Sequence, residues 1–331
     1  MNNRDKTIDI AKGIGITTVV WGHVGQSCPC KSEIFLFHMP LFFLLSGYFF
    51  KDKELTFINV LKKRIQSYLI PYIVFFTIIL LCFILLYVSI GYSDRIYLSP
   101  GIIVYPYGVV GALWFLLALF EVHMGYYLIA KYIQKEWIKF IICLICLIVS
   151  QTAFRLGINI PLYIGSSLSM MLFFHIGYMM HKYRILDSSK YRLILLVISI
   201  LCYTGGIVSG IDIDIKENKM EGNLPLVFPA VLGGSYIIIY LSYLLKEHNK
   251  ISLINTVLNY LGQNTLLIFS MHLLCLELAR CLFKFPPADE ATVLDGICIT
   301  IGGIIGSLII GIQIKKYILP YIKITKLKIL S

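Results

Sequence analysis

The sequence is poor in charged residues and has no long polar stretch. Only 14% of its 331 residues are Asp, Glu, Lys or Arg, whereas 58% are hydrophobic and 14% are aromatic. In a soluble domain about a quarter of all residues are charged, so this composition excludes a water-soluble globular protein. No polar segment is long enough to form a separate domain outside the apolar runs. The composition is that of a polytopic membrane protein.

The apolar residues are gathered into ten long runs. A helix needs roughly 20 apolar residues to cross the hydrocarbon core of a bilayer. The runs are continuous and do not alternate between apolar and polar positions, which excludes a membrane β-barrel. We therefore predict an all-α bundle of about ten transmembrane helices. The predicted spans are residues 8–28, 33–50, 65–90, 109–130, 138–157, 162–180, 193–210, 225–245, 262–283 and 292–313.

Basic residues outnumber acidic ones, 29 to 18, and give a net charge of +11. In the ten-span arrangement, most of them fall in connections on one side of the membrane, as is typical of the cytoplasmic side. Both termini are therefore predicted to be cytoplasmic, and the longest loops on the outer side are predicted at about 91–108 and 211–224. Because the positive charge follows one membrane face, it does not indicate nucleic-acid binding. No cleavable signal peptide is expected, since Asp9 and Lys12 interrupt the first apolar run.

Metal-binding patterns are scarce. The chain has nine cysteines, but most lie inside apolar runs, where a thiol behaves as a small hydrophobic group. Cys143 and Cys146 have CxxC spacing without a second pair or a neighbouring histidine. We therefore expect no metal site and no tightly bound cofactor.

Ionisable residues inside the apolar runs are the main candidates for function, because a charge at the bilayer centre costs roughly 3 kcal/mol. In "IDIAKGIGITTVVWGHVG" these residues are Asp9, Lys12 and His23. Lys12 and His23 are eleven residues apart, which places them within roughly 20° on one helix face and about 16 Å apart along the axis. Asp9 precedes Lys12 by three residues, so the two can pair. His38 lies toward the outer end of the next run, which follows a short connection, and is expected at a depth similar to that of His23.

Each of these residues also has a structural interpretation. Asp9 and Lys12 could anchor the helix end at the headgroups, and the two histidines could form hydrogen bonds at the outer interface. Three further candidates lie in later runs: Trp114 and Glu121 share one face of the fourth, and His272 lies near the middle of the ninth. We regard these three as substrate-contacting or supporting residues, with helix packing as the alternative.

Several segments together resemble the membrane acyltransferase type 3 family, whose members transfer acyl groups to bacterial surface glycans and related acceptors. The matching segments are spread over nearly the whole chain, and the first two, taken together, are specific for the family. They are "RDKTIDIAKGIGITTVVWGH" (4–23), "FHMPLFFLLSGYFF" (37–50), "KKRIQSYLIPY" (62–72), "LWFLLAL" (113–119), "FFHIGY" (173–178) and "LGQNTLLIFSMH" (261–272).

The resemblance implies a single transmembrane acyltransferase domain over residues 1–331, in the bacterial cytoplasmic membrane. It implies an acyl-CoA donor from the cytoplasm, acetyl-CoA first among them, and a glycan acceptor, cell-surface or lipid-linked. Lys12, Lys62, Lys63 and Arg64 fall at the inner boundary, where cations can pair with the phosphates of CoA. The family pattern has a second arginine three residues after the first, where this chain has Ser67. Membrane lipids and a second copy of the chain are the other expected partners.

Lys12 and His23 occupy the places of the family's first-helix basic residue and histidine. His23 would then be the general base for a sugar hydroxyl, or would itself carry the acyl group; the sequence leaves both open. Either role needs the neutral imidazole, and activity is expected to fall as the pH drops through its pKa, whose reference value is about 6.5. His38 or the Trp114 N–H could stabilise the oxyanion.

A secondary transporter is the rival function. In that case Asp9, Glu121 and the histidines would bind a solute or carry protons near the bilayer midplane. The absence of visible inverted repeats argues against it, and the basic inner boundary suits a large anionic donor better.

Overall fold

A computed structural model of the chain describes residues 5–89, 108–247, 252–286 and 290–322. Within this part, eight helices are long and apolar enough to cross a membrane, so the chain is an all-α membrane protein. The predicted spans at 8–28 and 33–50 are also helical, but they are not among these eight. The total of ten spans and the cytoplasmic termini therefore stay predictions.

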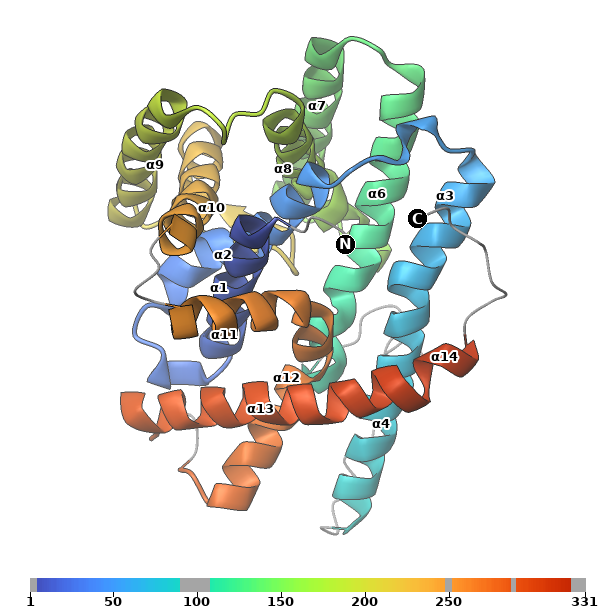
Figure 1. Cartoon of the computed structure of the whole chain (residues 1–331), viewed down its shortest axis with the longest axis vertical. Helices are drawn as coiled ribbons and strands as arrows, with labels where there is room; N and C mark the ends of the chain where they lie inside the picture. The colour runs from blue at the N-terminus through green and yellow to red at the C-terminus, as the bar shows by residue number, and fades with distance from the viewer. Residues whose placement is uncertain (1–4, 90–107, 248–251, 287–289, 323–331) are drawn as a thin grey trace.

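Figure 1 shows the helices in their order along the chain, from α1 in blue to α14 in red. A π-helical turn, residues Ile65–Leu69, joins α3 to α4. The α-helices are α1 (Lys6–Gly22), α2 (Lys31–Tyr48), α3 (Phe57–Arg64), α4 (Ile70–Ser89), α6 (Trp114–Tyr132), α7 (Glu136–Arg155), α8 (Ile164–Lys182), α9 (Ser189–Val208), α10 (Leu224–Glu247), α11 (Ser252–Gln263), α12 (Thr265–Phe283), α13 (Val293–Tyr317) and α14 (Leu319–Ile322).

The helices α1 and α2 form the centre of the bundle. Most of their residues are buried, and α2 crosses α8 at two small residues, Gly47 and Gly177. A Cβ on either glycine would lie 1.8 Å from a backbone carbonyl oxygen of the other helix. Glycine therefore permits this close crossing, as small residues commonly do between membrane helices.

The outer helices present apolar side chains to the surroundings. On α9, for example, Leu201 is 66% exposed and Val208 is 87% exposed. Exposed leucine, isoleucine and valine also line α7 and α13. In water such surfaces would be unfavourable, whereas hydrocarbon is a suitable solvent for them.

A short hairpin closes one end of the bundle. Its strands, β1 (Asp212–Asp214) and β2 (Lys219–Glu221), pair antiparallel, with Asp212 opposite Glu221. Ile213 and Met220 point into the core and are buried. This segment was expected to be an outer loop, and the other long outer loop, about 91–108, lies almost entirely outside the described residues.

Candidate functional site

A cavity of about 370 Å³ lies at the hairpin end of the bundle. Segments far apart in the sequence build it: the end of α1, the first turns of α2, the start of α6, the hairpin and the middle of α12. Its lining residues are Val19, His23, Lys31, Phe35, His38, Met39, Gly111, Ala112, Trp114, Asp214, Ile215, Lys216, Phe269, His272 and Leu273. We call this space the histidine cavity.

Three of the predicted histidines meet in the histidine cavity. The rings of His23 and His272 lie edge to face with centroids 5.1 Å apart, and Phe35 packs against both His23 and His38. His38 and His272 are buried, whereas His23 is exposed to the cavity. A substrate can therefore reach His23 most directly.

Backbone carbonyls fix the tautomer of these rings. The Nδ1 atom lies 2.7 Å from the Val19 oxygen in His23 and 2.9 Å from the Ile34 oxygen in His38. In His272 it lies 2.7 Å from the Phe269 oxygen. A carbonyl oxygen only accepts hydrogen bonds, so Nδ1 carries the proton and Nε2 of the neutral ring keeps its lone pair. Each ring is thereby prepared to accept a proton at Nε2.

Local structure explains how His23 reaches the cavity. His23 is the C-cap of α1, and its backbone N–H bonds to the Val20 oxygen. The helix ends at that point, so the imidazole lies at the rim of the bundle. The connection to α2 is short, and this brings His38 back to the same depth.

A second cavity of about 250 Å³ lies toward the start of α1. It combines two charged side chains with neutral polar ones, and we call it the inner cavity. Its lining residues are Asp9, Lys12, Phe42, Ser46, Ser67, Tyr68, Phe115, Leu116, Leu119, Gly262, Gln263, Thr265, Leu266 and Phe269.

One aromatic residue borders both cavities. Phe269 of α12 lines the inner cavity and the histidine cavity, and its ring centroid lies 5.0 Å from that of Phe115. The centroid of the Phe269 ring also lies 5.8 Å from that of the His272 ring. Phe269 therefore lies between the two spaces, and we call this residue with its contacts to Phe115 and His272 the Phe269 partition.

In the inner cavity, Asp9 and Lys12 occupy different surroundings. Asp9 is buried and lies 3.5 Å from Nε2 of Gln263, because Gly262 allows α11 to approach the backbone of α1 closely. Lys12 is half-buried, and its ammonium lies 4.8 Å from the centre of the Phe49 ring. A cation at this depth is well placed for an anionic ligand.

The basic cluster near α3 is organised around an acidic residue. Asp52 accepts hydrogen bonds from Lys63, at 2.7 Å, and from Arg64, and its side chain is almost fully buried. Burial raises the pKa of Asp52, but the hydrogen bond from Lys63 and the charge of Arg64 outweigh it and hold the pKa below its usual range. Lys62 is exposed. Two of the four cations expected to bind the donor, Lys63 and Arg64, are therefore paired with Asp52.

Arg64 is connected to the inner cavity through Tyr68. The Arg64 Nη1 atom donates to the Tyr68 hydroxyl at 3.4 Å, and that hydroxyl lies 3.5 Å from Nε2 of His123. Ser67, which stands where the related family has its second arginine, lines the inner cavity directly. An arginine at this position would enter the same space as Lys12.

Of the remaining two candidates, Trp114 and Glu121, one lines a cavity and the other links two helices. Trp114 lines the histidine cavity. Glu121 lines neither cavity; its Oε2 accepts a 2.6 Å hydrogen bond from Ser167 and links α6 to α8. Among the described residues, no group of three or more His, Cys, Asp or Glu is placed to hold a metal ion.

Three contributors to the site were not among the sequence candidates. Asp52 interrupts a run of basic residues, Phe269 precedes His272 by three residues on one helix face, and Lys216 lies in the outer loop. The helical spacing of Phe269 and His272 was visible in the sequence. Nothing in the sequence joined Lys216 to α1.

Comparison with known proteins gives a family. A family model described as an acyltransferase domain matches residues 5–312. The nodulation protein NolL of Sinorhizobium fredii is 30% identical over 175 residues, which cover 49% of this chain and 45% of that protein. NolL of Mesorhizobium japonicum is 36% identical over 91 residues, 24% of each chain. The chain thus spans less than half the length of either relative.

Proposed function

The chain belongs to this acyltransferase family, and from that premise we propose that it is an integral-membrane O-acyltransferase of the bacterial cytoplasmic membrane. It moves an acyl group, acetyl in the simplest case, from cytoplasmic acyl-CoA to a hydroxyl of a cell-surface or lipid-linked glycan. His23 is the catalytic residue, and Lys12 is the main cation for the donor.

The environment of His23 carries the proposal. Its Nδ1–H is held by the Val19 carbonyl, so Nε2 is the basic nitrogen of a ring that is exposed to the histidine cavity. A general base of this kind typically contributes 10²- to 10⁴-fold to a rate. His272 supports the ring from the side, with its own Nε2 buried.

The donor enters from the inner cavity. Its phosphates pair with Lys12, with Arg64 and the neighbouring lysines as a second group of cations. The neutral pantetheine arm then extends along α1, past the Phe269 partition, and presents the thioester to His23. Lys12 and His23 lie about 16 Å apart along the helix axis, so an extended arm is required.

The reaction is a direct acyl transfer. Nε2 of His23 takes the proton of the glycan hydroxyl while that oxygen attacks the thioester carbonyl. The tetrahedral intermediate collapses, the C–S bond breaks, and the CoA thiolate leaves and receives the proton from the imidazolium. In the alternative scheme, Nε2 first attacks the thioester, the C–S bond breaks and CoA leaves as the thiolate. The glycan hydroxyl then attacks the acyl group on Nε2, the N–C bond breaks, and the proton of the hydroxyl passes to the thiolate.

Trp114 is the better oxyanion stabiliser of the two candidates. The indole N–H can only donate a hydrogen bond. The Nδ1–H of His38 is already directed to the Ile34 oxygen, and its neutral Nε2 can only accept. His38 therefore shapes the cavity around His23, while Trp114 faces the developing charge.

The deciding experiment is transfer of radiolabelled acetyl from acetyl-CoA to a panel of surface-glycan acceptors by the purified protein in detergent. We expect label in the acceptor with the wild type, a loss of at least 100-fold with His23→Ala, and no change with His181→Ala. His181 is an exposed residue on α8 and serves as the matched control.

Three results would change the proposal. Equal transfer by His23→Ala and the wild type would remove His23 from the mechanism. Label retained on the protein without acceptor, and lost in His23→Ala, would select the acyl-carrier scheme. Absence of transfer and of CoA binding, with solute flux in proteoliposomes, would replace the acyltransferase by the transporter.

A further inference from the structure

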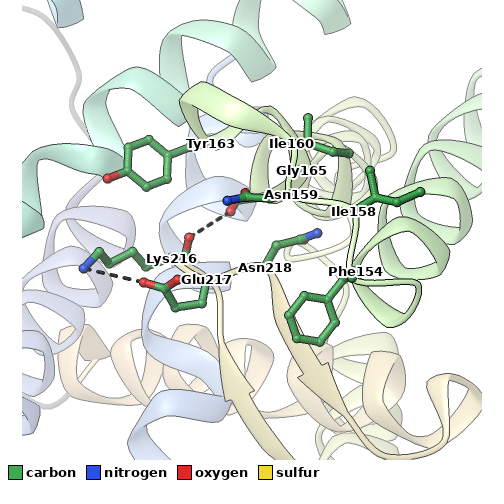
Figure 2. Close-up of a pocket in the computed structure, with 11 residues that line it drawn as sticks. Phe154, Ile158, Asn159, Ile160, Tyr163, Gly165, Lys216, Glu217 and Asn218 are labelled. Carbon is green, nitrogen blue, oxygen red and sulfur yellow. Dashed lines mark hydrogen bonds and ion pairs between the residues drawn. The ribbon is translucent and has the colours of Figure 1, made fainter. Parts of the chain in front are cut away.

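A third cavity, of about 250 Å³, shares the lining residue Lys216 with the histidine cavity. Figure 2 shows the residues that line this third cavity. Its wall is mixed in character: Asn159, Asn218, Glu217 and Lys216 supply polar groups, and Phe154 and Tyr163 supply rings. In Figure 2, Lys216, Glu217 and Tyr163 lie at one end of the space and Phe154 lies at the other. We call this space the outer cavity.

The outer cavity is connected with the histidine cavity by one shared lining residue and by one pair of packed rings. Lys216 lines both of them. The ring of Tyr163, in the outer cavity, also packs against Trp114, in the histidine cavity, with centroids 5.8 Å apart. A ligand that continues from one cavity into the other would therefore pass Lys216 and this aromatic pair.

The hairpin that carries Lys216 and Glu217 is held firmly to the bundle. Oδ1 of Asn218 accepts hydrogen bonds from Ser169, at 2.8 Å, and from Gln151, at 3.1 Å. Asn218 has a positive φ of 55°, a conformation that asparagine adopts more readily than most residues. Ser166 donates to the Lys216 carbonyl at 3.3 Å. The polar wall is thus preorganised.

The chemistry of this wall selects a class of ligand. Lys216 and Glu217 form an ion pair, with Nζ and Oε1 3.7 Å apart, so their charges balance and do not favour a charged ligand. Amide groups donate hydrogen bonds to hydroxyls and accept them, a carboxylate accepts them, and the rings offer apolar faces. The volume is slightly below the range of about 300–1,000 Å³ for drug-sized ligands, which suits a single sugar unit.

We propose that the outer cavity binds the acceptor glycan, holding a neutral sugar unit next to the one whose hydroxyl is acylated in the histidine cavity. This inference rests on the proposed function for the identity of the acceptor. It adds a binding site, with Glu217 and Asn159 as specificity residues, and it predicts that oligosaccharides are better acceptors than monosaccharides.

Binding of neutral sugars, measured by calorimetry in detergent without acyl-CoA, tests the site independently of catalysis. The probes are glucose, maltotriose and a fucosylated trisaccharide. We expect at least one trisaccharide to bind more tightly than the monosaccharide. Glu217→Ala and Asn159→Ala should each weaken that binding by about tenfold, because each removes hydrogen bonds to the sugar.

Glu221→Ala is the matched control. Glu221 lies on the same hairpin, is exposed, and pairs with Lys219 outside the cavity, so its replacement should leave sugar binding unchanged. Trisaccharide binding that is unaffected by Glu217→Ala and Asn159→Ala would overturn the inference, and so would binding to none of the probes. Intact binding without acetyl transfer would refute the proposed function but support the sugar site.

Discussion

The Phe269 partition makes a quantitative prediction about the donor. On the proposed function, the thioester passes from the inner cavity to His23, and for this the Phe269 ring must turn away from Phe115 and His272. The centroid of the Phe269 ring lies 5.0 Å from that of Phe115 and 5.8 Å from that of His272. Aromatic contacts of this kind contribute about 0.5–1.5 kcal/mol of stabilisation each. Displacing the ring therefore costs about 1–3 kcal/mol, which corresponds to a factor of roughly 5–150 in rate.

Phe269→Ala removes this obstacle and joins the two cavities. We expect acetyl-CoA hydrolysis without acceptor to rise by about tenfold, because the thioester and water then meet near His23 without displacing a ring. Phe269→Trp should do the opposite: the larger ring slows transfer while leaving CoA binding unchanged. Release of CoA, measured with a thiol reagent, reports hydrolysis directly.

The matched control is Phe283→Ala, on the same helix and 68% exposed, which should behave like the wild type. Core Phe→Ala substitutions cost about 3–5 kcal/mol, so the thermal midpoint of each variant is measured first. If folded Phe269→Ala hydrolyses acetyl-CoA within twofold of the wild-type rate, the thioester does not travel past this ring and the proposed path is wrong.

Three further predictions concern the donor side and the helix crossings. Asp52→Asn should lower stability by about 3 kcal/mol, seen as a lower thermal midpoint; because the Asp52 pKa is lowered below 3.8, this difference should be constant from pH 5 to 8 and disappear only in stronger acid. Ser67→Arg should lower the KM for acetyl-CoA several-fold, since the inner cavity gains a cation for phosphate, with KM for the acceptor unchanged. Gly177→Ala should unfold at a clearly lower temperature because its Cβ would lie 1.8 Å from the Leu44 oxygen, whereas Gly205→Ala, with open space around it, should be neutral or stabilising.

Much of the helical architecture could be predicted because the bilayer imposes it. Each of the eight long helices overlaps one predicted apolar run, since a span must be both long and apolar, although Phe57–Cys82 begins eight residues before the run predicted at 65–90. The helix α11, of 12 residues, was not predicted, because it is too short for a span and polar residues interrupt its apolar residues along the sequence. Apolar length detects helices that cross a membrane and overlooks those that do not.

The hairpin had a recognisable signal. Ile211, Ile213 and Ile215 alternate with polar residues and are all buried, which is the pattern of a strand with one face on the core. Within an otherwise helical chain, this stretch was assigned to a loop. Its function in lining two cavities depends on contacts with α7 and α8, far away in the sequence, that no local pattern contains.

The same reasoning explains which part of the site could be predicted from the sequence. The stripe from Lys12 to His23 lies on one helix, so helical geometry alone predicts it. The meeting of His38 and His272 around His23 depends on how three helices pack, and the tautomers depend on backbone carbonyls within hydrogen-bond distance. Sequence identifies candidate residues, while packing determines which of them share a cavity.

On the proposed function, the Phe269 partition also explains how an acyl group crosses while its carrier does not. Moving a charged group into apolar surroundings costs several kcal/mol, so the CoA phosphates stay with Lys12 in the inner cavity. The pantetheine arm carries no charge and can pass between Phe269 and Phe115 at the cost of displacing one ring. After transfer, the shortened arm withdraws, and the acyl group remains on the glycan at the hairpin end. An apolar partition with cations on one side and a base on the other therefore suits acyl transfer across the bundle, whereas a transporter would need a polar path for the whole solute.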